Sequence, residues 1–178
     1  AANGLLLSNH SYGYDPDSVP LSKWGRYDSD SKSYANVMFN APYYQFVNSA
    51  GNSRNAGYNE GKDGYDLLAG KSVCKNGIIV GAVNQVTNYT SPSSVTMSNF
   101  SSWGPTDDGR IKPDICGKGV NVRSSTSNSD NSYSSYNGPS MSSPNVAGTL
   151  LLLQQHCYHK NTSLLQHNLI LVFLVFLQ

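Results

Sequence analysis

Ser140 is the residue whose surroundings most favour nucleophilic chemistry. It lies in the stretch "SSYNGPSMSSPNVAG", between Gly138-Pro139 and Pro144, and an apolar run, "VAGTLLLL", follows it. Because proline is tolerated in the first turn of a helix, the pattern predicts a buried helix that opens at Ser140. Free N–H groups and the helix dipole favour negative charge at such a start, and an alkoxide or a tetrahedral oxyanion carries that charge. A serine that simply caps a core helix is the alternative explanation.

The residues around Ser140 match a known signature. "GPSMSSP" resembles the G-T-S-M-A-x-P motif of the subtilisin-like serine proteases, with Ser140 in the place of the nucleophile. The G-x-S-x-G nucleophile elbow does not fit, because its last position is Ser142 and no strand leads directly into Ser140. Three further blocks follow the order of the family: "LLLSNHSYG", "FVNSAGNS" and "FSSWGPTDDGRIKPDICGKGVNV". Since the blocks cover roughly residues 4–155, the chain is identified as a member of this family.

The resemblance implies roles for eight residues. Ser140 takes the place of the catalytic nucleophile, and Asn52 takes the place of the side-chain donor to the oxyanion. The expected substrate-binding residues are Ser11, Tyr12 and Gly13 in one wall of the cleft, and Ser49, Ala50 and Gly51 along the primary specificity pocket. In the family an extended polypeptide adds to that wall as a β-strand. The implied reaction is endopeptidase hydrolysis of a peptide bond through an acyl-enzyme on Ser140, with no catalytic metal and no required cofactor.

The same residues also have purely structural explanations. A Gly-Asn pair is common in turns because asparagine tolerates left-handed backbone, which would account for Asn52 without catalysis. The segment 11–13 would then be a plain loop. Pro139, where the family usually has threonine, removes an N–H beside Ser140. The alternative function is therefore a catalytically inactive fragment, or a non-enzymatic relative that keeps the cleft as a peptide-binding groove.

Apolar runs and turn signals predict an α/β protein. Strands are expected at Leu5–Leu7, 43–47 and 77–83, with a weaker one at 119–125. A helix is expected from Asp30 or Ser31 to about Asn40, and a second helix after Ser140. This order is typical of a parallel sheet, in which ligands bind beyond the carboxyl ends of the strands. The resemblance implies a three-layer αβα subtilisin-like fold with a mostly parallel sheet, incomplete at its N-terminal side.

The acid and the base of the implied reaction are expected upstream of this chain. In the family the Asp and the His precede the nucleophile, and this chain begins ten residues before Ser11. We therefore expect residues 1–158 to be a partial peptidase domain that is inactive as an isolated fragment. His10 is a poor substitute for the missing base, because a regular strand points it away from Ser11. Residues 159–178 read as an atypical tail from a shifted reading frame or a sequencing artefact.

Composition excludes some partners. Charged residues make up 13% of the 178 residues and the formal net charge is +1, which predicts no binding to nucleic acid or to an anionic membrane surface. The apolar run Leu169–Leu177 has nine residues, against about 20 for a membrane span. The surface must be rich in serine, asparagine and tyrosine, which favours a secreted protein. The three cysteines indicate neither a zinc site nor a disulfide framework.

One loop has the composition of a calcium site. "NEGKDGYD", Asn59–Asp66, is rich in oxygen donors but lacks the spacing of an EF-hand loop. We name calcium here as a candidate structural ion. A solvated surface loop is the alternative explanation of the same residues.

Overall fold

The computed structural model describes residues 4–41 and 43–159. Four parallel strands form one sheet in the order β1-β2-β3-β4: β1 (Leu7–His10), β2 (Gln45–Ser49), β3 (Ile78–Val83) and β4 (Ile115–Lys118). The strands β5 (Val122–Ser125) and β6 (Tyr133–Tyr136) form an antiparallel hairpin. The helices are α1 (Ser29–Phe39) and α2 (Pro139–His159), and the short 3₁₀ turns are η1 (Pro16–Ser18), η2 (Leu21–Lys23), η3 (Glu60–Lys62), η4 (Gly70–Val73) and η5 (Pro92–Ser94).

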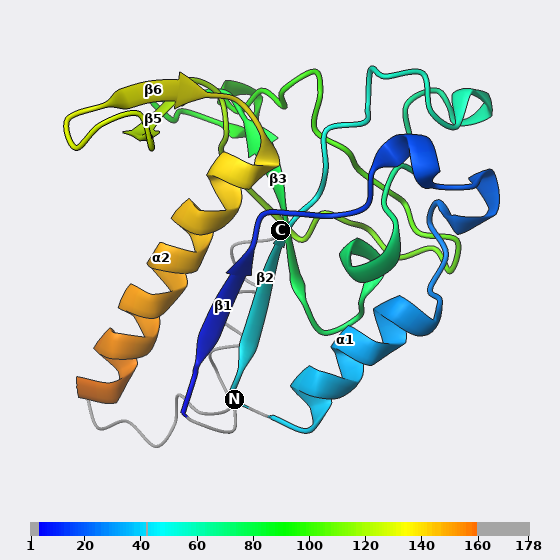
Figure 1. Cartoon of the computed structure of the whole chain (residues 1–178), viewed down its shortest axis with the longest axis horizontal. Helices are drawn as coiled ribbons and strands as arrows, with labels where there is room; N and C mark the ends of the chain where they lie inside the picture. Colours follow the sequence, from blue (N-terminus) through cyan, green and yellow to red (C-terminus); the bar gives the residue numbers. More distant parts are fainter. Residues whose placement is uncertain (1–3, 42, 160–178) are drawn as a thin grey trace.

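The two helices cover opposite faces of the sheet (Figure 1). Successive side chains of a strand point to opposite faces, so neighbouring residues of β2 belong to different cores. Phe46 packs with Met38 of α1, whereas Val47 packs with Val146 and Leu150 of α2. Both faces of β2 and β3 are therefore buried, as in parallel sheets generally. The expected three-layer αβα arrangement is confirmed in the described residues.

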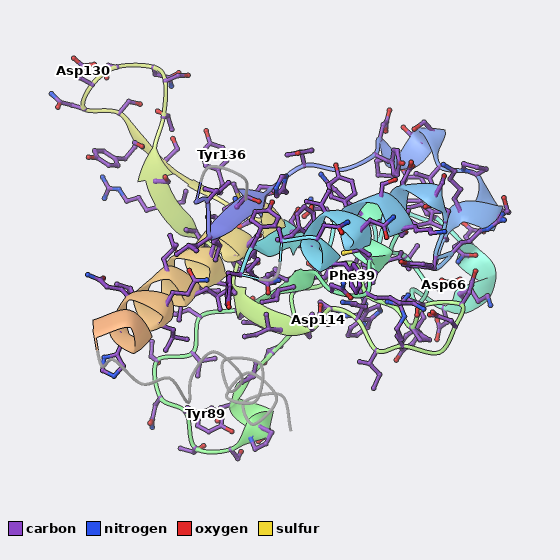
Figure 2. The ribbon with its side chains drawn as sticks, turned by 90° about the horizontal axis from the view of Figure 1, so that it is seen from below. Phe39, Asp66, Tyr89, Asp114, Asp130 and Tyr136 are labelled. Carbon is purple, nitrogen blue, oxygen red and sulfur yellow. The ribbon has the colours of Figure 1, made fainter. Side chains whose placement is uncertain are left out.

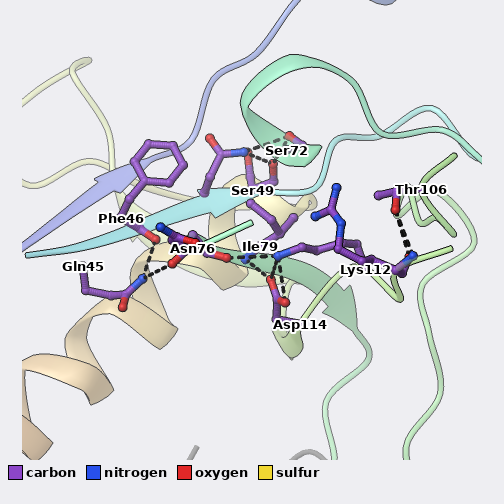
Figure 3. Close-up of polar contacts among 12 residues, drawn as sticks. Gln45, Phe46, Ser49, Ser72, Asn76, Ile79, Thr106, Lys112 and Asp114 are labelled. Carbon is purple, nitrogen blue, oxygen red and sulfur yellow. Dashed lines mark hydrogen bonds and ion pairs between the residues drawn. The ribbon is translucent and has the colours of Figure 1, made fainter. Parts of the chain in front are cut away.

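A buried ion pair holds the start of β3 against the segment that leads into β4. Lys112 is only 5% exposed, and its Nζ donates to Gly77 O at 3.1 Å and to both carboxylate oxygens of Asp114 at 2.8 and 2.7 Å. Asp114 Oδ2 also accepts the backbone N–H of Ile79 at 2.7 Å (Figure 3). All three N–H donors of the Lys112 ammonium have acceptors, so its contacts offset the free energy lost when the charge is removed from water. The pair therefore fixes β3 against the segment that leads into β4.

The first two strands are displaced from their predicted positions. The first strand was expected at Leu5–Leu7, but Leu5 and Leu6 are 52% and 47% exposed and β1 begins at Leu7. The second strand starts at Gln45 rather than at residue 43, because the parallel register pairs Leu7 with Gln45. Pairing and burial at the sheet edge, rather than the apolar run itself, decide where these strands begin.

The predicted strand at 119–125 is wrong as a single element. The chain forms β4 before residue 119 and β5 after Asn121, whose φ of 51° breaks the extended backbone. The "ICGK" sequence of β4 carries a weak hydrophobic signal, and its strand forms because it pairs along β3. The serine-rich segment after β5, for which no strand was predicted, returns as β6.

The helix predictions are close to the structure. Asp28, two residues before the predicted start, caps α1 by accepting the N–H groups of Asp30 and Ser31 at 3.1 Å each. The second helix, α2, begins at Pro139 and runs to His159. Within residues 4–41 and 43–159, no helix combines the length and the hydropathy needed to cross a membrane. Apart from His159, the predicted atypical tail at 159–178 lies outside the described residues.

Gly119 provides a test of how α2 is placed. A β-carbon at Gly119 would lie 2.6 Å from Ala82 Cβ and 2.7 Å from Gly138 O, in the turn that leads into α2. We expect Gly119→Ala to lower the free energy of unfolding by about 1–3 kcal/mol through overpacking. The matched control is Gly148→Ala inside α2, where nothing lies within 4 Å of the added carbon. It should raise stability by about 0.5–1 kcal/mol. Urea denaturation measures both, and equal effects would refute this packing argument.

Candidate active site

Ser140 and the segment after β1 are in direct contact. Ser140 is the second residue of α2, and its Oγ donates a hydrogen bond to Ser11 O at 3.3 Å. In return, Ser11 Oγ donates to Ser140 O at 3.1 Å. Ser11 follows directly from the carboxyl end of β1, the edge of a parallel sheet at which ligands bind. The structure therefore brings together the predicted nucleophile and the predicted cleft wall.

Pro144 has a different role from the one predicted. It was expected in the first turn of the helix, where a missing N–H has no consequence, but it is the sixth residue of α2. An N–H at this position would bond to the carbonyl four residues earlier, which is that of Ser140. Because proline has no N–H, Ser140 O is left free for Ser11 Oγ. Pro144 thus makes the contact between α2 and the cleft wall available.

Asn52 faces the turn that precedes Ser140. Gly138 has a φ of 149°, and a β-carbon on it would lie 3.3 Å from Asn52 Oδ1. The backbone of Gly138 is held by its N–H, which donates to Gly119 O at 2.8 Å. Asn52 itself is exposed, so its amide is accessible to a ligand. The structure thus brings the predicted oxyanion donor next to the turn into α2.

The loop that carries Asn52 is supported from beneath by Ser102. Gly51 has a φ of 106°, and its carbonyl accepts the N–H of Ser102 at 2.9 Å. The side chain of Ser102 in turn accepts the N–H of Ser53 at 2.9 Å. Ser102 is fully buried and belongs to the "FSSWG" block of the sequence. This contact gives a physical reason for two serines in that block, since Ser101 Oγ likewise accepts the N–H of Ala82 at 3.0 Å.

The residues predicted for the specificity pocket differ in exposure. Ser49 ends β2 and is buried, and its carbonyl accepts Asn48 Nδ2 at 2.7 Å and Ser72 Oγ at 3.4 Å (Figure 3). Ala50 is also buried and donates its N–H to Val80 O at 2.9 Å. Only Gly51 is partly exposed. In this structure, therefore, Ser49 and Ala50 support the loop while Gly51 and Asn52 are open to solvent.

Tyr12 and Gly13 present an open stretch of backbone. The Tyr12 side chain is 60% exposed, and nothing lies within 4 Å of a β-carbon added at Gly13. The backbone groups of these two residues make no hydrogen bond to any other residue in the described ranges. An extended peptide can form backbone hydrogen bonds with such unpaired N–H and C=O groups and so add a strand beside the sheet.

His10 is not placed to assist Ser140. Its Nε2 lies 2.6 Å from Ser8 Oγ, its Nδ1 lies 2.7 Å from Tyr12 Oη, and its ring packs 4.5 Å from the ring of Phe46. Phe46 belongs to the core on the α1 side, whereas α2 lies on the other face of the sheet. The expectation that His10 points away from Ser11 is confirmed. Burial, and then the charge of Lys71, lower the pKa of His10.

Lys71 is a residue of this region that sequence reasoning missed. Its side chain is only 7% exposed, and Nζ lies 3.1 Å from the centroid of the Tyr12 ring and 5.9 Å from that of Tyr34. Among the described residues it has no carboxylate partner within 4.0 Å, and burial lowers the pKa of Lys71 to about 8. A single lysine in "LLAGKSVC" carries no signal of burial, because η4 forms only by packing against β2 and α1.

The lowered pKa of Lys71 predicts a pH dependence of stability. The unfolded lysine keeps its proton up to about pH 10.5, whereas the folded one loses it near pH 8. Between these values the unfolded chain binds more protons, so the free energy of unfolding increases with pH. We expect Lys71→Met to remove this increase, while the exposed Lys32→Met keeps it. Denaturation curves at several pH values between 7 and 10.5 measure the slopes, and parallel slopes for Lys71→Met and wild type would contradict the prediction.

Known proteases resemble this chain in sequence. The sequence model of the subtilase family matches residues 1–170. C5a peptidase of Streptococcus pyogenes is 51% identical over 63 residues, which are 35% of this chain and 5% of that protein. PII-type proteinase of Lactococcus lactis subsp. cremoris is 43% identical over 65 residues, 36% of this chain and 3% of that protein. The chain thus matches only a small part of the length of these relatives.

Solved structures share the fold. The self-cleaved protease domain of PatA superposes with a TM-score of 0.61 at 20% identity, over 90% of this chain and 50% of that one. Sphericase superposes with a TM-score of 0.56 at 22% identity, over 83% of this chain and 42% of its own. Both likenesses concern the fold alone, and they confirm the subtilisin-like α/β architecture expected from sequence.

Proposed function

Because the chain belongs to the subtilase family, we propose that it carries the nucleophile and the oxyanion-binding residues of a serine endopeptidase. The observation that carries the proposal is the position of Ser140 at the start of α2, in contact with Ser11 and beside the turn that Asn52 faces. A capping serine in a core helix would not need an exposed asparagine amide next to it. The three elements therefore fit a site for a reacting carbonyl.

The proposed reaction proceeds through an acyl-enzyme. Ser140 Oγ attacks the carbonyl carbon of the scissile peptide bond, and the Oγ–C bond forms as the Oγ proton passes to a general base. The C–N bond then breaks, the amine leaves with a proton, and water hydrolyses the ester. Of the histidines in the described residues, His10 packs against Phe46 on the other face of the sheet, and His156 and His159 lie sixteen and nineteen residues beyond Ser140 in α2. The mechanism therefore requires an acid and a base from outside them.

The negative oxygen of the tetrahedral intermediate is assigned to two donors. The backbone N–H of Ser140 is among the first of α2, so it has no partner within the helix. With Asn52 Oδ1 toward Gly138, the Nδ2 of the same amide is left to donate to the oxyanion. The positive end of the α2 dipole adds to this stabilisation. Because these donors are already oriented before the reaction, no free energy is spent on reorienting them as negative charge develops on the oxygen.

The proposed substrate is a polypeptide bound in an extended conformation. The free backbone groups of Tyr12 and Gly13 would pair with it as with an added strand. Gly51 and the buried Ser49 and Ala50 would line the pocket for the side chain next to the scissile bond. Secretion remains part of the proposal, supported by the low share of charged residues, 13%.

Fluorophosphonate labelling tests the role of Ser140. We expect the gene product at its natural length to be labelled covalently and Ser140→Ala to be unlabelled. Ser135→Ala, an exposed serine of β6, is the matched control and should label like wild type. Mass spectrometry of the labelled peptide locates the adduct. Equal labelling of wild type and Ser140→Ala would overturn the catalytic role, and peptide binding without any labelling would favour the non-enzymatic groove.

Asn52 is tested by the split between kcat and KM. We expect Asn52→Ala to lower kcat by about 10²–10³-fold with little change in KM, a magnitude known from a subtilisin, because the donor acts mainly on the transition state. Asn55→Ala, an exposed asparagine of the same loop, should leave both constants unchanged. Steady-state peptide hydrolysis measures them. A wild-type kcat in Asn52→Ala would remove this residue from the oxyanion site.

A further inference from the structure

The ammonium of Lys71 has no anion to pair with. The residue is only 7% exposed, and Nζ lies 3.1 Å from the centroid of the Tyr12 ring. In the described part of the chain, no carboxylate oxygen lies within 4.0 Å of it. The lysine ammonium groups that donate hydrogen bonds there are those of Lys112 and Lys118. A ring face attracts the charge but is not an oxygen acceptor, so the three N–H donors of Lys71 remain open to a ligand.

The carboxylates on the neighbouring helix are already engaged. The short turn η4, which carries Lys71, packs against α1. Asp28, the cap of α1, has its Oδ2 3.6 Å from Lys23 Nζ, and Asp30 Oδ2 lies 3.8 Å from the same atom. Asp30 also accepts a hydrogen bond from Tyr14 Oη. Since these two are the acidic residues of α1 and its cap, the helix offers Lys71 no free carboxylate.

Lys71 lies at the edge of the sheet to which the proposed substrate adds. Its neighbour Ser72 accepts Asn48 Nδ2 at 2.9 Å and donates to Ser49 O at 3.4 Å, which ties η4 to the carboxyl end of β2 (Figure 3). Tyr12 follows the carboxyl end of β1, the strand that pairs with β2. Lys71 therefore contacts the cleft wall, while the residue next to it supports the loop predicted to form the specificity pocket.

The Lys71 ammonium is accessible beside the Tyr12 ring. Nζ has no hydrogen-bond partner in the described residues, yet it is not one of the fully enclosed polar atoms without a partner, so it reaches the surface. The Tyr12 side chain is 60% exposed, and its Oη lies 2.7 Å from His10 Nδ1. This contact holds the ring against Lys71, while most of the ring stays open to solvent.

A second cation on a tyrosine ring shows what is particular to Lys71. Arg123 lies 5.4 Å from the centroid of the Tyr133 ring. Both residues are exposed and belong to the β5–β6 hairpin, which projects away from α1 with Asp130 at its tip (Figure 2). Water solvates Arg123 there, so an anionic ligand would add little. Lys71 has lost most of that water, and a carboxylate would replace it.

We propose that Lys71 is a specificity-determining residue and that it selects polypeptide substrates with an aspartate or glutamate side chain next to Tyr12. This role rests on the proposed function, which aligns an extended substrate along Tyr12 and Gly13. In a complex with a carboxylate both partners are charged, whereas the isosteric amide of glutamine offers a neutral acceptor. The site therefore discriminates by charge rather than by size.

Peptides that differ only in glutamate against glutamine test this preference. Each position that can pair with Tyr12 and Gly13 carries Glu or Gln in turn, and kcat/KM is measured at neutral pH on the gene product at its natural length. We expect one position at which Glu is favoured by about 10–100-fold, the range expected for a hydrogen bond to a charged group. Lys71→Met should abolish this preference, because it removes the ammonium.

The ratio of the two rates separates selectivity from stability. A loss of folded protein lowers both rates equally and so cancels from the ratio within each variant. Lys32→Met removes an exposed lysine from α1 and should keep the wild-type ratio. Lys71→Met retains an unbranched side chain against Tyr12. If it keeps the wild-type ratio as well, the role of Lys71 is overturned.

Binding to the Ser140→Ala variant separates this role from the proposed function. Fluorescence anisotropy gives the Kd of labelled Glu and Gln peptides, which this variant should not cleave. A Glu preference that depends on Lys71, without Ser140-dependent hydrolysis by wild type, would overturn the endopeptidase and keep the role of Lys71. Hydrolysis that depends on Ser140 but is equal for Glu and Gln at every position would overturn the role of Lys71 alone. If neither peptide binds nor is cleaved, both proposals fail.

Discussion

Two hydrogen bonds between Ser11 and Ser140 join the end of an edge strand to the start of α2, and the candidate site depends on them. One of them exists because Pro144 leaves the carbonyl of Ser140 without a helical donor. A residue inside α2 thus determines a contact outside it. On the other side, Gly138 lets Asn52 approach closely, since a β-carbon on it would lie only 3.3 Å from Asn52 Oδ1.

The buried charged residues of this fold differ in whether hydrogen bonds and ion pairs satisfy their charge. Lys112 donates to Gly77 O and to Asp114, and this satisfied pair positions two strands. Lys71 lies against the rings of Tyr12 and Tyr34 without a carboxylate partner in the described residues, and burial lowers its pKa to about 8, which makes stability depend on pH. Asp66 has one carboxylate oxygen with no hydrogen-bond partner in the described residues, and burial raises its pKa. The same burial that stabilises the first pair therefore leaves the other two charges open to protons or ligands.

Local pattern and tertiary pairing contributed differently to each element. The strand at Ile78–Val83 was predicted almost to the residue, because an uninterrupted apolar run between turn signals is buried on both faces. β4 was missed because its "ICGK" sequence is extended only by pairing with β3. β6 was missed for a related reason, as its serines and tyrosines form a strand only in the hairpin with β5. The start of α1 was predicted two residues late, because Asp28 rather than Asp30 or Ser31 accepts the N–H groups of the first turn.

By itself, the sequence determined the family, the α/β class and the identity of Ser140 and Asn52 as candidates, because these depend on short motifs whose residues are neighbours along the chain. Only the tertiary structure decided that Ser11 contacts Ser140 and that Lys71 is buried. These facts depend on which face of a strand or loop each side chain occupies, and a one-residue change of register would reverse them without altering any motif.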